Sequence, residues 1–402
     1  MVGEEVRGGM HDRGPVRARD LGIVIGEGRP GRFNAITDVA GVRVGHATII
    51  RGDGPLVRGQ GPIRTGVTVI VPHDGDPWSE PVFAGAHVLN GNGDMSGLEW
   101  IRETGLFHGP LAITNTNSLG VVRDALIEIG ISEEHPDHPA WSLPVVGETH
   151  DGQLNDIGGM HVRPEHVRAA LDAAAAGPVT EGTVGGGTGM ICHEFKGGIG
   201  TASRVLPAAA GGWTVGVLAQ ANYGRRELLR IDGVPVGLEI PTSDVPSPWA
   251  SPRPGIGGRA GGSGPGETTA GSGSTIIIVA TDAPLLPHQC ARLAQRAGLG
   301  LARMGGLGAT SSGDLFMAFA TGNRNHPAGE AEPVGPGVVR LLALVDPALD
   351  PLFEATVEAT EEAITNALVA ADTMTGRDGI TAHRLPHDRL RDVMAKHGRL
   401  GD

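Results

Sequence analysis

Short runs of apolar residues, some alternating with polar ones, recur along the chain and predict β-strands. Alternation places every second side chain on one face of a sheet, whereas a continuous apolar run is typical of a strand buried on both faces. The runs lie at residues 42–44, 66–71, 110–117, 214–221, 275–280 and 315–321. The run at 275–280 starts abruptly, directly after a stretch with almost no large apolar side chain.

Helical spacing of apolar residues marks four other segments, at residues 121–129, 164–176, 286–304 and 351–373. Pro164 stands at a first-turn position and Gly177 follows the second of them, as is common at helix ends. In the last, Phe353, Val357 and Ile364 recur at helical intervals. Because strands and helices are interleaved, we predict a mixed α/β or α+β fold, whose topology periodicity alone does not decide.

Two segments lack either pattern. Residues 1–20 are charged and rich in glycine, which predicts a flexible arm. Residues 242–273 are rich in Pro, Gly, Ser and Thr, which predicts a flexible linker inside one domain spanning 1–402.

Composition excludes several classes of protein. Lys and Arg number 32 against 45 Asp and Glu, and the formal charge of −13 argues against binding to nucleic acid or to an anionic membrane. Two cysteines cannot form a disulfide framework and suit a reducing compartment. The N-terminus lacks the apolar core of a signal peptide, and no run is long enough to span a membrane. We therefore expect a cytoplasmic protein.

Other candidate sites are weak. The glycines at 185–189 fit neither the dinucleotide fingerprint nor a phosphate-binding loop, so a tight turn beside closely packed backbone is the better interpretation. His135, Asp137 and His138 stand among prolines in a polar stretch, which favours a solvated loop over a metal site. Cys192 and Cys290 have no patterned histidine partner, and buried, inert thiols are expected.

The junction at Gly273-Ser274 is the informative feature. A hydroxyl residue placed there can attack the preceding carbonyl, and hydrolysis of the resulting ester leaves Ser274 with a free α-amine. That amine, with an ordinary pKa near ~8, can act as general base for its own hydroxyl. Thr275 is a rival nucleophile by the same chemistry. From spacing alone, the more common explanation is that Gly273-Ser274 merely marks the end of a linker.

Eight blocks, taken in order along nearly the whole chain, resemble one known family. The blocks are NAITDV (34–39), GVRVGH (41–46), NGNG (90–93), TNT (114–116), GET (147–149), LND (154–156), KGGIGTASR (196–204) and ATDAPL (280–285). Singly they are weak signals, but in this order the sequence resembles the DmpA-type aminopeptidases. These are the self-cleaving β-aminopeptidyl peptidases and L-aminopeptidase/D-esterases.

The resemblance implies roles for individual residues. The family's nucleophile falls on Ser274, with cleavage after Gly273, and its oxyanion-stabilising asparagine falls on Asn222. Its second serine and nearby carboxylate fall on Ser312 and Asp314, which would hold the amine and hydroxyl in register.

Three further residues enter through the same resemblance. A lysine used by the related nylon-oligomer hydrolases matches Lys196. His150 stands where the family usually has a tyrosine after the GET block, so a different donor would face the reacting carbonyl. Glu148, in that block, is a candidate partner for a substrate ammonium group.

The resemblance also implies a four-layer α/β/β/α sandwich, formed by a large subunit (1–273) and a small one (274–402). Family members assemble as homotetramers of such heterodimers and need no metal or organic cofactor. The implied substrate is a small peptide or amide with a small N-terminal α- or β-amino acid.

Three alternatives remain at this point. The same chemistry would suit an amide hydrolase of the nylon-oligomer type, which Lys196 permits, or an acyltransferase. A different class is an uncleaved, catalytically silent binding protein of the same fold, which His150 and the long 242–273 segment would suit. Replacing Ser274 by alanine separates the enzymes from the binding protein.

Overall fold

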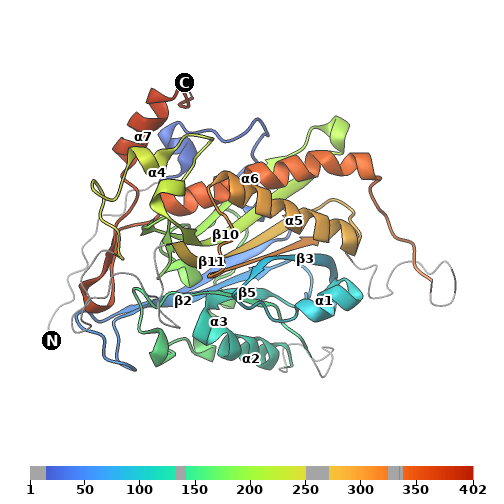
Figure 1. Cartoon of the computed structure of the whole chain (residues 1–402). Helices are drawn as coiled ribbons and strands as arrows, with labels where there is room; N and C mark the ends of the chain where they lie inside the picture. Colours follow the sequence, from blue (N-terminus) through green and yellow to red (C-terminus); the bar gives the residue numbers. More distant parts are fainter. Residues whose placement is uncertain (1–14, 132–141, 250–270, 325–334, 336–337, 402) are drawn as a thin grey trace, which may run out of the picture.

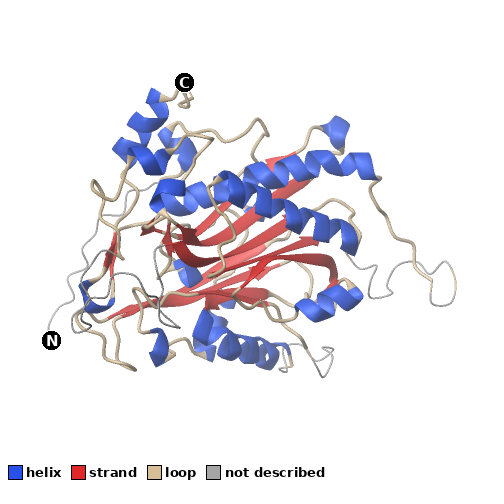
Figure 2. Cartoon of the chain, in the orientation of Figure 1, coloured by secondary structure: helices blue, strands red, loops and turns tan. Residues whose placement is uncertain are grey.

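The structure is a computed structural model that describes residues 15–131, 142–249, 271–324, 335 and 338–401. Two β-sheets lie face to face, and helices cover the outer face of each, so that four layers are stacked (Figure 1). The predicted α/β/β/α sandwich is therefore confirmed. Figure 2 shows the sheets in the middle of the molecule and helices on both sides of them.

The first sheet has four strands in the order β1-β2-β5-β6. Pairing is antiparallel except between β5 and β6, which are parallel. The strands are β1 (Arg43–Arg51), β2 (Ile63–Val71), β5 (Leu111–Asn115) and β6 (Val146–Thr149).

The second sheet has six strands in the order β4-β3-β12-β11-β10-β9. Only the central pair, β11 and β12, is parallel. The strands are β3 (Val82–Gly91), β4 (Leu106–Phe107), β9 (Gly198–Val205), β10 (Thr214–Gly224), β11 (Gly271–Thr281) and β12 (Ser312–Ala320).

Helices α2 (Leu119–Gly130) and α3 (Pro164–Asp172) cover the first sheet, and α5 (Pro287–Arg303) and α6 (Asp350–Val369) cover the second. All four correspond to segments with helical spacing, although α3 ends before residue 176. The remaining helices and two small hairpins are α1 (Leu98–Thr104), α4 (Val236–Glu239), α7 (His387–Lys396), β7 (Ile191–Cys192) with β8 (Phe195–Lys196), and β13 (Met374–Thr375) with β14 (Thr381–Ala382).

Strand β11 is buried on both faces, which explains its continuous apolar run. Ile276 and Ile278 belong to the apolar core between the two sheets. Ile277 and Val279 belong to the core between the second sheet and its helices. Because successive side chains of a strand point to opposite faces, β11 packs against the first sheet on one face and against the helices on the other.

Two expectations from the sequence need revision. The arm predicted for 1–20 is wrong for residues 15–20, because Ala18 is buried and Arg17 forms an ion pair with Glu181 at 2.6 Å; residues 1–14 lie outside the described residues. The apolar spacing predicted for 351–373 does not describe all of helix α6, which is packed on β9, β10 and α5 and buried around most of its surface. Its buried Glu362 forms ion pairs with Arg19 and Arg204.

The segment predicted as a linker is described only at its two ends. In its first part Val245 and Ser247 are buried. At its other end β11 begins at Gly271, so Gly273 and Ser274 are strand residues. Residues 250–270, between them, lie outside the described residues. No helix in the described part of the chain is long and apolar enough to cross a membrane.

Candidate active site

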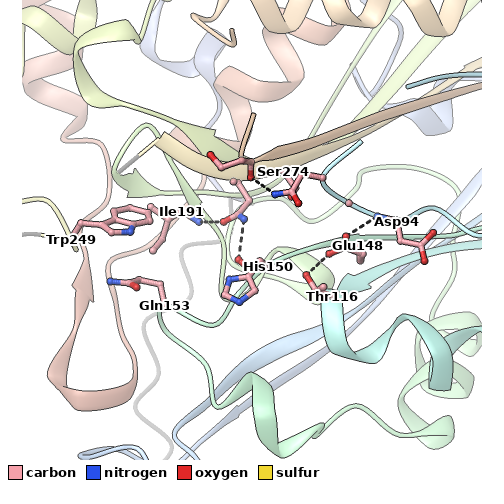
Figure 3. A pocket seen from close by; sticks show the side chains of 13 residues that line it. Asp94, Thr116, Glu148, His150, Gln153, Ile191, Trp249 and Ser274 are labelled. Carbon is pink, nitrogen blue, oxygen red and sulfur yellow. Dashed lines mark hydrogen bonds between the residues drawn. The ribbon is translucent and has the colours of Figure 1, made fainter. Parts of the chain in front are cut away.

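A cavity of about 560 Å³ opens between the two sheets, where several strands begin or end at one edge. Ser274 and Asn222 line it from the second sheet, and Glu148 and His150 from the end of β6 (Figure 3). Four residues from three distant parts of the sequence, all assigned roles from the family resemblance, therefore meet in one place.

Ser274 lies near the start of β11 and is 4% exposed. Its side chain lines the cavity on the inter-sheet face, the face that Ile276 occupies two residues later. The preceding Gly273 is sterically required here, because a Cβ atom at this position would lie 1.9 Å from the carbonyl oxygen of Asn222. Glycine at position 273 thus allows β10 to approach β11 closely.

Asn222 is directly opposite Ser274 in the ladder between β10 and β11, and a register shift follows before Gly224. Its Oδ1 accepts a hydrogen bond from the backbone N–H of Ile191 at 2.8 Å. Its Nδ2 donates to the backbone carbonyl of His150 at 3.0 Å. Since an amide nitrogen carries two hydrogens, one remains for a ligand in the cavity. The side chain is oriented from both sides, as an oxyanion donor requires.

Glu148 is 2% exposed and supplies a carboxylate to the same cavity. It accepts hydrogen bonds from the backbone N–H of Asp94 at 2.9 Å and from the hydroxyl of Thr116. Burial raises the pKa of this carboxyl above its ordinary value, although the two hydrogen bonds oppose the shift. Within the described residues, the hydrogen-bond partners of this carboxylate are Asp94 and Thr116, and no Lys or Arg forms an ion pair with it. A buried acid without a cationic partner is suited to binding a ligand ammonium group.

His150 is half-buried, and its ring lines the cavity. Burial and the charge of Arg377 lower its pKa, so the imidazole is neutral at neutral pH. A neutral imidazole can donate one hydrogen bond to a ligand. The backbone carbonyl of His150 orients Asn222 whichever side chain stands at this position.

Ser312 and Asp314 lie beside the Gly273-Ser274 peptide but not in the same cavity. In the parallel ladder Ser312 is opposite Gly273, and Gly313 is opposite Ser274. Their side chains share the face of β12 that carries Phe316, toward the helices, and they line a second cavity of about 240 Å³. The pair predicted to assist Ser274 is therefore adjacent to its backbone and separated from its hydroxyl by the sheet.

The two residues of this pair are coupled. The hydroxyl of Ser312 donates to Oδ1 of Asp314 at 2.8 Å. Burial raises the pKa of Asp314 to about 6, although the bond from Ser312 lowers it. A carboxyl that changes charge near neutral pH therefore lies beside the backbone of residues 273 and 274.

Lys196 does not line the cavity. Its ammonium donates to the carbonyls of Gly187, Met190 and Gly197 at 3.2, 2.9 and 2.7 Å. Complete burial lowers its pKa to about 7. The lysine holds the segment that leads to Ile191, whose N–H orients Asn222. Its connection with the site is indirect.

Seven further side chains line the cavity and were given no role from the sequence: Asn92, Asp94, Thr116, Gln153, Ile191, Trp249 and Ser311. Thr116 is part of the TNT block and Asp94 directly follows the NGNG block, so the resemblance held a signal for both. Gln153 and Ile191 had no such signal. Trp249 is a lone aromatic residue in a segment rich in Pro and Ser, and it was absorbed into the predicted linker.

The weaker candidates from sequence are placed elsewhere. In the part of the chain that the structure describes, no three His, Cys, Asp or Glu residues are grouped as metal ligands. His135, Asp137 and His138 lie outside that part. Cys192 and Cys290 are buried, as expected, and burial raises the pKa of Cys192 to about 12, which keeps it an unreactive thiol. Gly186 has the close backbone neighbours expected of the glycine cluster, since a Cβ there would lie 2.6 Å from the carbonyl oxygen of Ile113.

Comparison with known proteins agrees with the residue-level similarities. The model of peptidase family S58 matches residues 34–382. The beta-peptidyl aminopeptidase BapA of Sphingosinicella microcystinivorans is 48% identical over 400 residues, covering 100% of this chain and 97% of that protein. BapA of Sphingosinicella xenopeptidilytica is 45% identical over 384 residues, covering 94% of this chain and 90% of that protein.

Solved structures give the same result for the fold. A beta-aminopeptidase from a Burkholderia species has a TM-score of 0.84 and 53% identity, covering 95% of this chain and 99% of the other. The L-aminopeptidase D-Ala-esterase/amidase of Ochrobactrum anthropi has a TM-score of 0.81 and 42% identity, covering 96% and 99%. It is described as a variant of the N-terminal nucleophile (Ntn) hydrolase fold. This chain therefore belongs to peptidase family S58 and is a serine-type hydrolase with the Ntn-hydrolase fold.

Proposed function

We propose that this aminopeptidase matures by cleavage between Gly273 and Ser274 and then removes N-terminal β-amino acids from small peptides and amides. The observation that carries the proposal is that one cavity contains the Ser274 hydroxyl, the Asn222 amide and the buried Glu148 carboxylate. The similarity to two beta-peptidyl aminopeptidases, at 48% and 45% identity, supports the β-amino acid as the residue released.

Maturation converts Ser274 into a nucleophile that carries its own base. The Oγ of Ser274 attacks the carbonyl carbon of Gly273, and the bond from that carbon to the Ser274 nitrogen breaks. The proton lost from Oγ passes to the departing nitrogen, which becomes the α-amine. Water then hydrolyses the ester, so that Gly273 ends in a carboxylate and Ser274 regains its hydroxyl.

Catalysis then follows the chemistry of an N-terminal nucleophile. The α-amine of Ser274 takes the proton from Oγ as Oγ attacks the substrate carbonyl carbon. The free N–H of Asn222 donates to the oxygen that becomes negative; one such donor is typically worth ~10²–10³ in rate. The ammonium formed gives its proton to the leaving amine, and water completes the cycle by attacking the acyl-enzyme.

Glu148 gives the site its preference for a chain end. A carboxylate buried in the cavity would bind the ammonium group of the substrate, and along a peptide backbone only the first residue carries one. On the other face of the sheet, Ser312 and Asp314 would steady the new α-amine after cleavage, since they neighbour the backbone of residues 273 and 274.

The experiment that tests the proposal compares the wild type, Ser274→Ala and Thr275→Ala. We expect the wild type to form two chains and to hydrolyse β-alanyl p-nitroanilide faster than the L-alanyl compound. Ser274→Ala should do neither, and Thr275→Ala should still be cleaved. Cleavage in Ser274→Ala but not in Thr275→Ala would move the nucleophile by one residue. An uncleaved wild type without activity would favour the binding protein.

The alternative of a nylon-oligomer-type hydrolase draws no support from the position of Lys196, which does not line the cavity. The predicted tetramer of αβ heterodimers and the cytoplasmic location stay part of the proposal. Light scattering after size-exclusion chromatography would test the first, and cell fractionation the second.

A further inference from the structure

The cavity has two chemically different ends, with the nucleophile between them. At one end lie the carboxylates of Glu148 and Asp94; at the other lie Trp249, Ile191 and Gln153 (Figure 3). If Glu148 binds the substrate ammonium, the acyl part of the substrate occupies the acidic end. The leaving amine must then continue past Ser274 toward the other end.

Trp249 is held firmly at that end. It packs on an apolar cluster that includes Leu154, Ile191 and Met374. The carbonyl of the preceding residue, Pro248, accepts a hydrogen bond from the buried side chain of Gln153 at 3.1 Å. A half-buried tryptophan packed in this way offers the apolar face of its ring to the cavity, together with an indole N–H that has no hydrogen-bond partner among the described residues.

We propose that Trp249, with Ile191 and Gln153, forms the subsite for the leaving group, and that this subsite favours an aromatic or bulky apolar amine. The inference rests on the proposed function, since it needs Glu148 to fix the direction of the substrate. Trp249 is then a specificity-determining residue, because it contacts the leaving amine of the substrate. The acidic end of the cavity would determine which N-terminal amino acid is released.

A leaving-group subsite should affect acylation but not deacylation. Substrates with the same acyl group pass through the same acyl-enzyme, which no longer contains the leaving amine. A change at Trp249 should therefore alter kcat/KM in proportion to the size of the leaving group. It should not alter the hydrolysis of the shared intermediate.

The test uses processed protein, verified by intact mass, and two substrates with one acyl group: β-alanyl p-nitroanilide and β-alaninamide. For Trp249→Ala we expect kcat/KM to fall about tenfold or more for the anilide and less than about threefold for the amide, since filling an apolar subsite is typically worth 10-fold or more. Trp249→Phe, which keeps a ring, should retain most of the preference.

The matched control is Trp213→Ala. Trp213 is also half-buried, but it packs at the edge of the core between the second sheet and its helices, just before β10. The Trp213→Ala variant should leave the ratio of kcat/KM for the anilide to kcat/KM for the amide unchanged. The subsite would be overturned if Trp249→Ala lowered kcat/KM equally for both substrates and also lowered Tm. It would equally be overturned if kcat/KM fell for neither substrate. A wild type that hydrolyses neither substrate would instead overturn the proposed function, and the subsite with it.

Discussion

Asn222 and Ser274 face each other directly across the antiparallel ladder between β10 and β11, and the regular ladder ends there. The donor proposed for the oxyanion and the proposed nucleophile are thus carried by two adjacent interior strands of the six-stranded sheet. Groups fixed on paired strands can be held to the tolerance that catalysis requires, because neither depends on a loop for its position.

The Asn222→Asp variant should lower kcat by about 100- to 1000-fold. Aspartate keeps the shape and the acceptor for the N–H of Ile191, but it has no N–H to donate to the oxyanion. Steady-state kinetics on β-alanyl p-nitroanilide would measure the loss. Asn117→Asp is the control, because Asn117 makes one exposed hydrogen bond outside the cavity. A kcat within a few-fold of the wild type in Asn222→Asp would remove Asn222 from the mechanism.

Gly273→Ala should slow or abolish maturation and lower Tm. The added Cβ would lie 1.9 Å from the carbonyl oxygen of Asn222, so β10 and β11 must move apart at the proposed cleavage site. Intact mass and thermal unfolding would show both effects. In Gly120→Ala the new methyl group meets nothing within 4 Å on helix α2, so processing and Tm should be retained there. Normal cleavage and Tm in Gly273→Ala would contradict the close approach.

Glu148→Gln should raise KM and lower kcat/KM by about 10- to 100-fold, the usual value of a hydrogen bond to a charged group. Because burial raises the pKa of Glu148, kcat/KM of the wild type should fall as acid protonates this carboxyl, above the pH expected for an ordinary glutamate. The variant should lack that part of the pH profile. Glu103→Gln, on the surface, is the control. An unchanged KM in Glu148→Gln would show that the ammonium binds elsewhere.

Asp314→Asn should be less active but more stable at neutral pH. The pKa of Asp314 is about 6 in the folded protein against 3.8 ordinarily, so its negative charge opposes folding once the pH exceeds the ordinary value. The increase in the free energy of unfolding of Asp314→Asn over the wild type should be absent below about pH 4 and grow as the pH rises. It should level off above pH 6 at no more than about 3 kcal/mol.

Chemical denaturation of processed protein at several pH values would measure this gain. Asp172→Asn, at an exposed position, should change stability by less than about 0.5 kcal/mol throughout. A loss of stability at neutral pH in Asp314→Asn would mean that the charged carboxylate stabilises the fold.

The spacing of apolar residues predicted most of the strands and helices, because the residues of each element alone produce that spacing. The run after Ser274 reads as a strand buried on both faces, and the spacing in 351–373 reads as a helix. The polar contacts of that helix were not predictable: Glu362 is buried because Arg19 and Arg204, distant in sequence, bind it there. Such pairs depend on tertiary packing, which periodicity does not record.

The site was predictable only in part. The residues to which the family resemblance assigned roles include Ser274, Asn222 and Glu148, which the structure brings to one cavity. It could not be foreseen that Ser312 and Asp314 lie on the other face of the sheet, because that depends on strand register. Trp249 was missed because a single aromatic residue in a Pro-rich segment has no periodic neighbours, and its role depends on Pro248 and Gln153 meeting across the fold.

The intact mass of the purified protein under denaturing conditions shows whether Ser274 becomes an N-terminal nucleophile. We expect two chains from the wild type, with the smaller one beginning Ser-Thr-Ile-Ile-Ile, and a single chain of 41.3 kDa from Ser274→Ala. A wild type that remains one chain of 41.3 kDa while hydrolysing β-alanyl p-nitroanilide would contradict that role, because Ser274 would then have no free amine to act as its base.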